Sequence, residues 1–345
     1  MMFTMRMAMS TSTIMGMFVM MIIIFHLLIV YFLYCKGMAL NVQLGCKNNR
    51  ANFVLRLIYI NFAPKITRMS TNNRIIYRAI ALDLDGTLTN NKKEVTPATR
   101  EALLTAQENG ANIILASGRP TFGIEPVAEC LELSTRGGYI LSYNGGKIID
   151  WRTKQELFSQ HLPADIIPQL YNYAKKHNYA LLGYVGKEIV TESADDIYVA
   201  EESRINKMPI RKVENLLAEL EPNPTKLLMT ADPTIATEAE RELHEIVGNR
   251  MDVYRSAPFF IELVPKGIDK AQSLLRLLAK LNLTPQDMIA FGDGYNDLSM
   301  LRLAGMGVAM SNAAPEVRSE ADYVTLSNEE DGVAVAINKL CYNTD

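Results

Sequence analysis

Two carboxylates stand one residue apart where an apolar run ends. Residues 78–84 read RAIALDL, which is typical of a strand covered on both faces, and Asp83 is followed by Asp85, Gly86 and Thr87. Side chains two residues apart on an extended segment point to the same side, and a turn at Gly86 can bring Asp85 around the same small volume. One carboxylate could then act as a nucleophile while the other transfers a proton.

Further polar side chains stand at other predicted strand and helix ends: Ser117, Gly118, Lys270, Asp293, Asn296 and Asp297. In open parallel α/β sheets, ligands bind at the carboxyl ends of the strands, so we expect these residues to converge. Carboxylates this concentrated repel one another unless a cation neutralises them, and an all-oxygen site suits Mg²⁺. The hydroxyl of Ser117 and the ammonium of Lys270 can hold the remaining oxygens of a phosphoryl group.

The elements that must position these residues alternate between strand and helix. Thr96 and Pro97 predict the start of a helix that Gly110 closes, and Asn144 stands in a predicted hairpin turn. The expected helices are 96–110, one that begins at Pro120, 266–283, 296–305 and 330–340. The expected strands include 78–84, 111–117, 287–293, 306–310 and 322–326, with a hairpin-like segment over 139–149. This alternation predicts an α/β fold with a doubly wound parallel sheet.

Four stretches occur in an order that resembles a known family. DLDGTLT, the Ser of LASGRP, the Lys of PKGIDK and GDGYND are similar to the ordered motifs of the haloacid dehalogenase superfamily of phosphotransferases. The upstream YILSYNGG and the tail GVAMSNAAPEVRSEADYVTLSNEEDGVAVAI narrow the resemblance to the Cof-type phosphatases, which hydrolyse small phosphorylated metabolites. It implies a Rossmann-like core over 69–151 and 257–345, with a smaller α/β cap inserted over 152–256.

The resemblance also implies roles for the acidic residues. Asp83 would be the nucleophile that forms an aspartyl-phosphate, and Asp85 the general acid for the leaving alcohol and then the base for water. Mg²⁺ would be bound by Asp83, the backbone carbonyl of Asp85 and Asp293, with Asp297 ordering the water shell of the metal.

A second group of residues would bind the substrate. The resemblance assigns Ser117, Gly118, Lys270 and Asn296 to the phosphate, and Thr87 to support of the loop or of the Asp85 side chain. Asn144 is read first as a turn residue and then as a substrate contact.

Residues 1–68 differ from the rest of the chain. Ile14 to Cys35 is a run of 22 residues without a formal charge, long enough to cross a bilayer as a helix. It is interpreted either as a single membrane anchor or as part of a mis-assigned start upstream of Met69. If the run is inserted, more basic residues follow it than precede it, and the positive-inside rule keeps the catalytic body in the cytoplasm. A mis-assigned start also leaves the body in the cytoplasm, without the tether.

Charge and motif content disfavour several other classes of protein. Residues 1–82 carry nine basic and no acidic side chains, whereas residues 83–345 carry a net charge of −12. An acidic body without a basic stripe does not resemble a nucleic-acid binder. The chain has no GxxxxGK[ST], GxGxxG or GxSxG motif, which disfavours nucleotide-dependent kinases of that type, dinucleotide dehydrogenases and serine hydrolases.

The leading hypothesis is therefore a Mg²⁺-dependent phosphomonoesterase of small phosphorylated metabolites, such as sugar phosphates or a phosphorylated cofactor. The alternatives are a phosphotransferase or phosphomutase on the same scaffold, which passes the phosphoryl group to a sugar hydroxyl, and a non-catalytic protein that binds phosphorylated ligands. The last alternative is expected to lack one of the two carboxylates, and both Asp83 and Asp85 are present.

Overall fold

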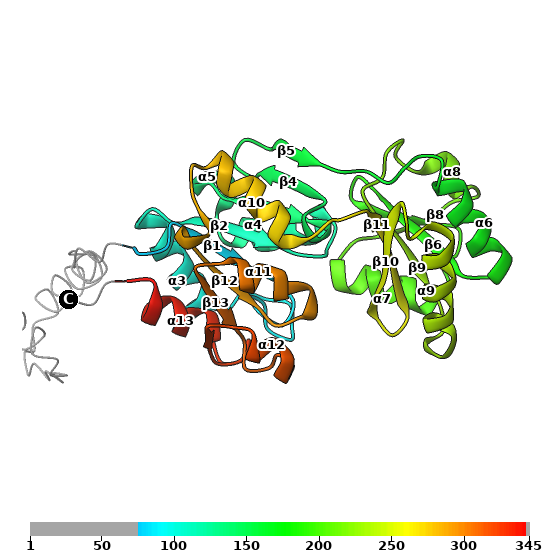
Figure 1. The fold of residues 1–345 in the computed structure, drawn as a ribbon. Helices are drawn as coiled ribbons and strands as arrows, with labels where there is room; N and C mark the ends of the chain where they lie inside the picture. The colour runs from blue at the N-terminus through cyan, green and yellow to red at the C-terminus, as the bar shows by residue number, and fades with distance from the viewer. Residues whose placement is uncertain (1–74, 343–345) are drawn as a thin grey trace, which may run out of the picture. The chain divides into compact units, whose positions relative to one another are not determined.

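The larger sheet is centred on the strand that precedes Asp83. A computed structural model describes residues 75–342 (Figure 1). Its eight-stranded sheet has the order β14-β13-β12-β1-β2-β3-β4-β5. β1 (Ala79–Leu82) is fully buried and pairs in parallel with β12 (Met288–Gly292) and β2 (Asn112–Ala116). The predicted parallel α/β sheet is confirmed.

The remaining strands of this sheet complete its two edges. One edge carries β13 (Met306–Ala309) and β14 (Tyr323–Val324) in parallel pairing. At the other edge β3 (Tyr139–Ser142) is parallel to β2, whereas β4 (Lys147–Asp150) and β5 (Gln155–Ser159) return in antiparallel pairing.

Helices cover both faces of this sheet because the side chains of β1 alternate between two apolar clusters. Ile80 and Leu82 lie in one cluster, and Ala79 and Ala81 lie in the other. The first face is covered by α3 (Pro97–Glu108), α4 (Thr121–Cys130), α5 (Leu133–Arg136) and α13 (Gly332–Leu340). The second is covered by α10 (Lys270–Lys280), α11 (Leu298–Leu303) and α12 (Pro315–Ser319).

A second sheet is built largely from antiparallel pairs. Its order is β10-β11-β9-β6-β7-β8, with β7 and β8 parallel. Its strands are β6 (Ala180–Val185), β7 (Glu188–Thr191), β8 (Ile210–Lys212), β9 (Leu227–Thr230), β10 (Met251–Ala257) and β11 (Phe260–Pro265). The helices of this region are α6 (Ile167–His177), α7 (Ile197–Asn206), α8 (Leu216–Glu219) and α9 (Pro233–Val247).

The limits of this second sheet differ from those predicted for the cap. β5 pairs with β4 in the eight-stranded sheet, so position 152 falls between two strands of that sheet. β10 and β11 form one antiparallel hairpin in the six-stranded sheet, so position 256 falls inside β10. The predicted limits differ because β5 and β10 are placed in their sheets by antiparallel pairing across hairpins. The sequence pattern of a strand does not indicate the sheet to which it belongs. The division into core and cap stays a prediction, with limits that the strand pairing moves toward the C-terminus.

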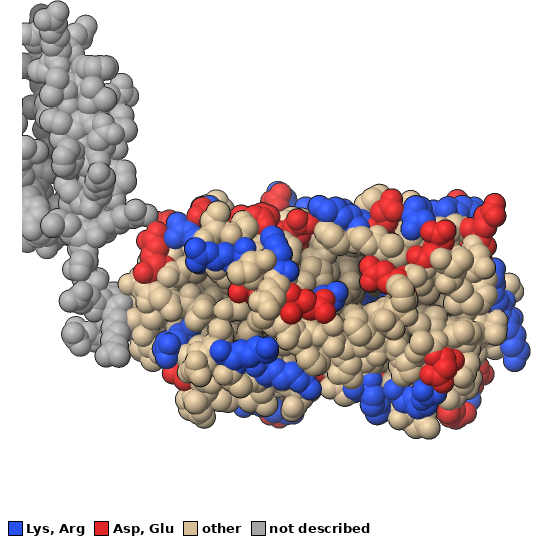
Figure 2. Space-filling model, turned by 90° about the horizontal axis from the view of Figure 1, so that it is seen from above, with Lys and Arg blue, Asp and Glu red and all other residues tan. Residues whose placement is uncertain are grey.

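The predicted membrane segment 14–35, and with it the choice between an anchor and a mis-assigned start, lies outside the described residues. Within residues 75–342, no helix combines the length and the apolar character needed to cross a bilayer. On the face that Figure 2 shows, acidic and basic side chains are interspersed rather than gathered by sign.

Candidate active site

Lys270 joins the first, third and fourth motifs. It is the first residue of α10, whose N-cap Asp269 accepts a hydrogen bond from the backbone N of Gln272. Its Nζ donates to Asp83 Oδ1 and to Asp297 Oδ1, each at 2.6 Å. Lys270 is 1% exposed, Asp83 6% and Asp297 1%, so these charges are withdrawn from water and depend on one another.

Three carboxylates form an acidic cluster beside this lysine. Asp83, Asp293 and Asp297 each offer an oxygen, and these oxygens lie within 4.8 Å of one another. Burial, together with Asp297, raises the pKa of Asp83 to about 8 even though Lys270 opposes the shift. Burial likewise raises the pKa of Asp293 to about 6. One ammonium does not balance three carboxylates, so this all-oxygen set fits a bound divalent cation.

Backbone donors and a glycine hold the cluster in place. Asp297 Oδ2 accepts hydrogen bonds from the backbone N of Asp293 at 3.0 Å and of Gly294 at 2.9 Å. Gly86 has φ +85°, and a Cβ there would lie 2.3 Å from Asp293 Oδ2, so the turn needs glycine. Thr87 Oγ1 donates to Asp293 Oδ1 at 2.7 Å. The turn at Gly86 brings Thr87 toward Asp293 at the end of β12. The Thr87 hydroxyl thus supports Asp293 and not the Asp85 side chain.

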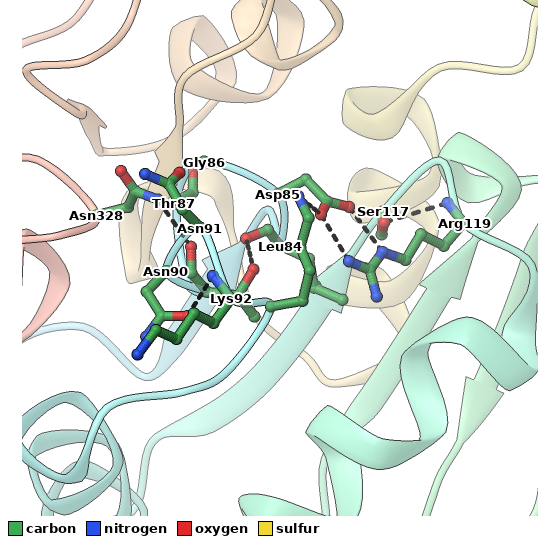
Figure 3. Close-up of polar contacts among 12 residues, drawn as sticks. Leu84, Asp85, Gly86, Thr87, Asn90, Asn91, Lys92, Ser117, Arg119 and Asn328 are labelled. Atoms are coloured by element: carbon green, nitrogen blue, oxygen red, sulfur yellow. Dashed lines mark hydrogen bonds and ion pairs between the residues drawn. The ribbon is translucent and has the colours of Figure 1, made fainter. Parts of the chain in front are cut away.

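The Asp85 side chain is engaged by two basic residues outside the acidic cluster. Arg119 donates from Nε to Oδ2 at 2.7 Å and from Nη2 to Oδ1 at 2.6 Å, and Lys93 Nζ donates to Oδ1 at 2.6 Å. Figure 3 shows the guanidinium of Arg119 facing this carboxylate. Burial alone would raise the pKa of Asp85, but the hydrogen bonds and charges of Arg119 and Lys93 outweigh burial and lower it.

Neither basic residue was among the predicted site residues. Arg119 follows Ser117 in LASGRP, directly after a predicted strand, so its place at a strand end was an available signal. Lys93 lies in a turn with φ 61°, where nothing in the sequence links it to Asp85.

The predicted phosphate residues of the second and fourth motifs lie together. Ser117 follows β2, and its Oγ accepts from the backbone N of Arg119 at 3.1 Å. Asn144 lies at φ 56° in a 3-10 turn, and its backbone N donates to Ser117 O at 2.8 Å. A Cβ on Gly118 would lie 3.3 Å from the Asn144 amide, and Asn296 Nδ2 donates to Asn144 Oδ1 at 3.2 Å. All predicted site residues thus belong to one constellation, while their individual roles stay predictions.

One residue of the six-stranded sheet reaches this constellation. Asn144 Nδ2 donates to Tyr254 Oη of β10 at 2.8 Å. The sequence carried no signal for Tyr254, since an aromatic residue at alternate strand spacing is typical of packing.

The geometry of the four motifs agrees with a match to a protein family. Residues 80–337 match the haloacid dehalogenase-like hydrolase family. The chain belongs to this family. The membership confirms the predicted resemblance and the predicted enzyme class, a hydrolase of the phosphatase type.

Three relatives of this hydrolase illustrate the similarity. A haloacid dehalogenase-like hydrolase from Bacteroides thetaiotaomicron has a crystal structure that is 48% identical, with a TM-score of 0.75 over 76% of this chain and 99% of that one. YxeH of Bacillus subtilis is 32% identical over 268 residues, which are 77% of this chain and 98% of YxeH. The 5-amino-6-(5-phospho-D-ribitylamino)uracil phosphatase YcsE of Bacillus subtilis is 30% identical over 262 residues, 75% of this chain and 94% of YcsE.

Proposed function

We propose that this hydrolase is a Mg²⁺-dependent phosphomonoesterase of a small phosphorylated metabolite, acting through an aspartyl-phosphate on Asp83. The observation that carries the proposal is the buried arrangement of Lys270 between Asp83 and Asp297, with Asp293 in the same acidic cluster. A nucleophilic carboxylate beside both a fixed ammonium and a cation site is what phosphoryl transfer to an aspartate requires, since the transferred group carries charge throughout.

The reaction can be written with residues of this chain alone. Lys270 holds Asp83 Oδ1, and no described residue donates a hydrogen bond to Oδ2, which is left to attack phosphorus. The bond from phosphorus to the ester oxygen breaks, and Asp85 protonates the departing alcohol. Asp85 then takes a proton from water, whose oxygen attacks the aspartyl-phosphate, releasing phosphate and restoring Asp83. The lowered pKa of Asp85 favours its carboxylate form, which suits this second step and opposes the first, for which Asp85 must carry a proton.

The acidic cluster and one neighbouring backbone carbonyl would supply the ligands for the metal. Asp83, Asp293 and the backbone carbonyl of Asp85 would hold Mg²⁺, with Asp297 ordering its water shell. When bound, Mg²⁺ supplies positive charge that offsets the repulsion between the carboxylates and the incoming phosphate. A phosphorylated metabolite as substrate is supported by the relative YcsE, which is named for a phosphorylated ribitylamino-uracil.

A panel of phosphorylated metabolites tests the proposal directly. We expect the purified protein to release inorganic phosphate from a subset of the panel with Mg²⁺, and to lose this activity in EDTA. Recovery of an isomerised sugar phosphate without free phosphate would instead indicate a mutase. Binding of the panel without turnover would indicate a non-catalytic protein and overturn the proposal.

A further inference from the structure

Tyr254 offers a hydrogen-bond donor to the substrate from the six-stranded sheet. We infer that it is a specificity-determining residue, which selects esters bearing an oxygen on the carbon next to the ester carbon. The inference rests on the proposed phosphatase function and adds to it a residue that discriminates between leaving groups.

Tyr254 lies beside the predicted phosphate-binding residues although it is distant from them in sequence. Its Oη accepts the hydrogen bond from Asn144 Nδ2 at 2.8 Å. Asn144 in turn is bound through its backbone to Ser117 and lies against Gly118. The phenol is therefore one amide group away from the residues that would hold the phosphate, on the side from which the six-stranded sheet approaches.

The phenolic hydrogen is free to be donated. Oη accepts from Asn144, and Tyr254 donates no hydrogen bond to any of the residues that the structure describes. Glu262 lies directly opposite in the β10–β11 pair, but Ser256 Oγ and Lys226 Nζ already bind its two oxygens, each at 2.6 Å. Burial and the charge of Glu262 raise the pKa of Tyr254, so the phenol keeps its proton.

A second tyrosine of this sheet shows that a free hydroxyl is not the rule there. Tyr184 Oη donates to Glu202 Oε1 at 2.6 Å, and both residues are buried. A buried hydroxyl without an acceptor costs free energy, so its hydrogen is normally paired. Tyr254 differs because it is only half-buried, so its hydroxyl hydrogen can meet an acceptor that enters the site.

The position of the donor restricts where this acceptor can be. Asn144 binds both Ser117 O and Tyr254 Oη, so β10 lies on the Asn144 side of a phosphate held at Ser117 and Gly118, and we take the ester group to leave on that side. A hydrogen bond from Tyr254 Oη spans only about 3 Å, so its acceptor must lie near the ester bond. A hydroxyl on the next carbon, as in polyol and sugar phosphates, meets this condition, whereas a simple alkyl phosphate has no such oxygen.

The test compares two esters that differ in their hydroxyl groups, glycerol 3-phosphate and propyl phosphate. With Mg²⁺, the wild type is expected to prefer glycerol 3-phosphate in kcat/KM by about tenfold, the effect of one well-placed hydrogen bond. Tyr254→Phe should reduce this preference to within about twofold. The ratio of the two kcat/KM values is the readout, because the change also removes the acceptor for Asn144 Nδ2 and can slow both esters. Tyr173→Phe is the matched control, because Tyr173 lies on α6 and its Oη donates to Glu242 on α9. This variant should keep the preference for glycerol 3-phosphate.

Several outcomes would overturn the inference. Two of them are seen with the wild-type protein alone. The wild type could show no preference for glycerol 3-phosphate, or it could hydrolyse other phosphomonoesters but not glycerol 3-phosphate. Equal losses on both esters in Tyr254→Phe would show that the phenol only positions Asn144, and an unchanged preference would show no role. If the Phe variant does not fold, Tyr254→Met replaces it. A wild type that releases phosphate from no ester contradicts the proposed function itself, a result distinct from all of these.

Discussion

Asp83 combines a raised pKa with a fixed position, and its replacement separates catalysis from folding. Asp83→Asn keeps the side-chain volume but removes the attacking charge, so turnover should fall by about 1,000-fold or more while the fold is retained. Phosphate release and circular dichroism on the same preparation check this expectation. Asp195→Asn is the control, because Asp195 is an exposed aspartate that pairs with Lys212 away from the acidic cluster. Activity of Asp83→Asn within about tenfold of wild type would contradict the nucleophile assignment.

Asp85 can be tested through the leaving group. If it protonates the departing alcohol, Asp85→Asn should slow alkyl phosphates by about 100-fold or more and activated aryl phosphates much less, because an aryl oxide leaves without a proton. The measurement is kcat for both ester classes with Mg²⁺. Equal losses of kcat on the two ester classes would argue that the Asp85 side chain maintains the conformation of its loop and does not act as the general acid.

At the scale of single residues, the strand-end rule explains what could be predicted. Asp83, Ser117 and Asp293 each follow a strand of the parallel sheet, so their convergence is a property of the topology. The ion pair of Asp85 with Arg119 and Lys93 depends on how two loops fold back, and loop geometry of this kind is not encoded in a periodic pattern.

Helix α10 positions Lys270, so loss of the N-cap residue Asp269 is expected to affect catalysis as well as stability. Asp269→Ala removes the acceptor for Gln272 N and should lower the free energy of unfolding by about 1 kcal/mol. It should also reduce kcat by about tenfold or more, because Lys270 is the next residue. Urea denaturation and steady-state kinetics measure the two effects.

A matched N-cap exists on α9, where Asp232 accepts from the backbone N of Thr234 at 2.9 Å. Asp232→Ala should cost a similar free energy of unfolding without the kinetic loss. If both variants lose activity to the same extent, general destabilisation and not the position of Lys270 would be responsible.

At the scale of elements, local signals predicted well where capping and apolar periodicity agree. Thr96 caps α3 and accepts from Thr99 N, with Pro97 as the first helical residue. The limits of the inserted sheet were not predictable in this way. β5 and β11 are assigned to their sheets by antiparallel partners in β4 and β10, a tertiary choice that their own residues do not express.

The raised pKa values of the acidic cluster make stability of the whole molecule depend on pH and Mg²⁺. In the described structure Asp83 has a pKa of about 8 and Asp293 of about 6, both above the 3.8 of an ordinary aspartate. Between the ordinary pKa of 3.8 and the raised pKa of about 8, the folded state binds more protons than the unfolded state. The free energy of unfolding without metal should therefore fall as pH rises through this range. Mg²⁺ competes with these protons and should therefore raise Tm more at about pH 8 than at about pH 5.

Thermal melts with and without Mg²⁺ at the two pH values test this linkage. Asp293→Asn should abolish most of the Mg²⁺-dependent rise in Tm, whereas Asp195→Asn should preserve it. A rise of equal size at both pH values, or a larger one under acidic conditions, would show that Mg²⁺ does not bind at the acidic cluster.

The central place of β1 between β2 and β12 has a consequence for how the molecule is made. β1 emerges early from the ribosome, yet its partner β12 and the aspartates that follow it are synthesised some two hundred residues later. The six-stranded sheet, by contrast, comes from one continuous stretch, β6 to β11, and can complete its pairing during synthesis. Until β12 arrives, one edge of β1 has no neighbour, and until α10 is made shortly before it, Asp83 lacks its partner Lys270. Nascent chains that stop short of β12 are thus expected to present an open apolar strand, which makes this interval of translation the one that most needs chaperone protection.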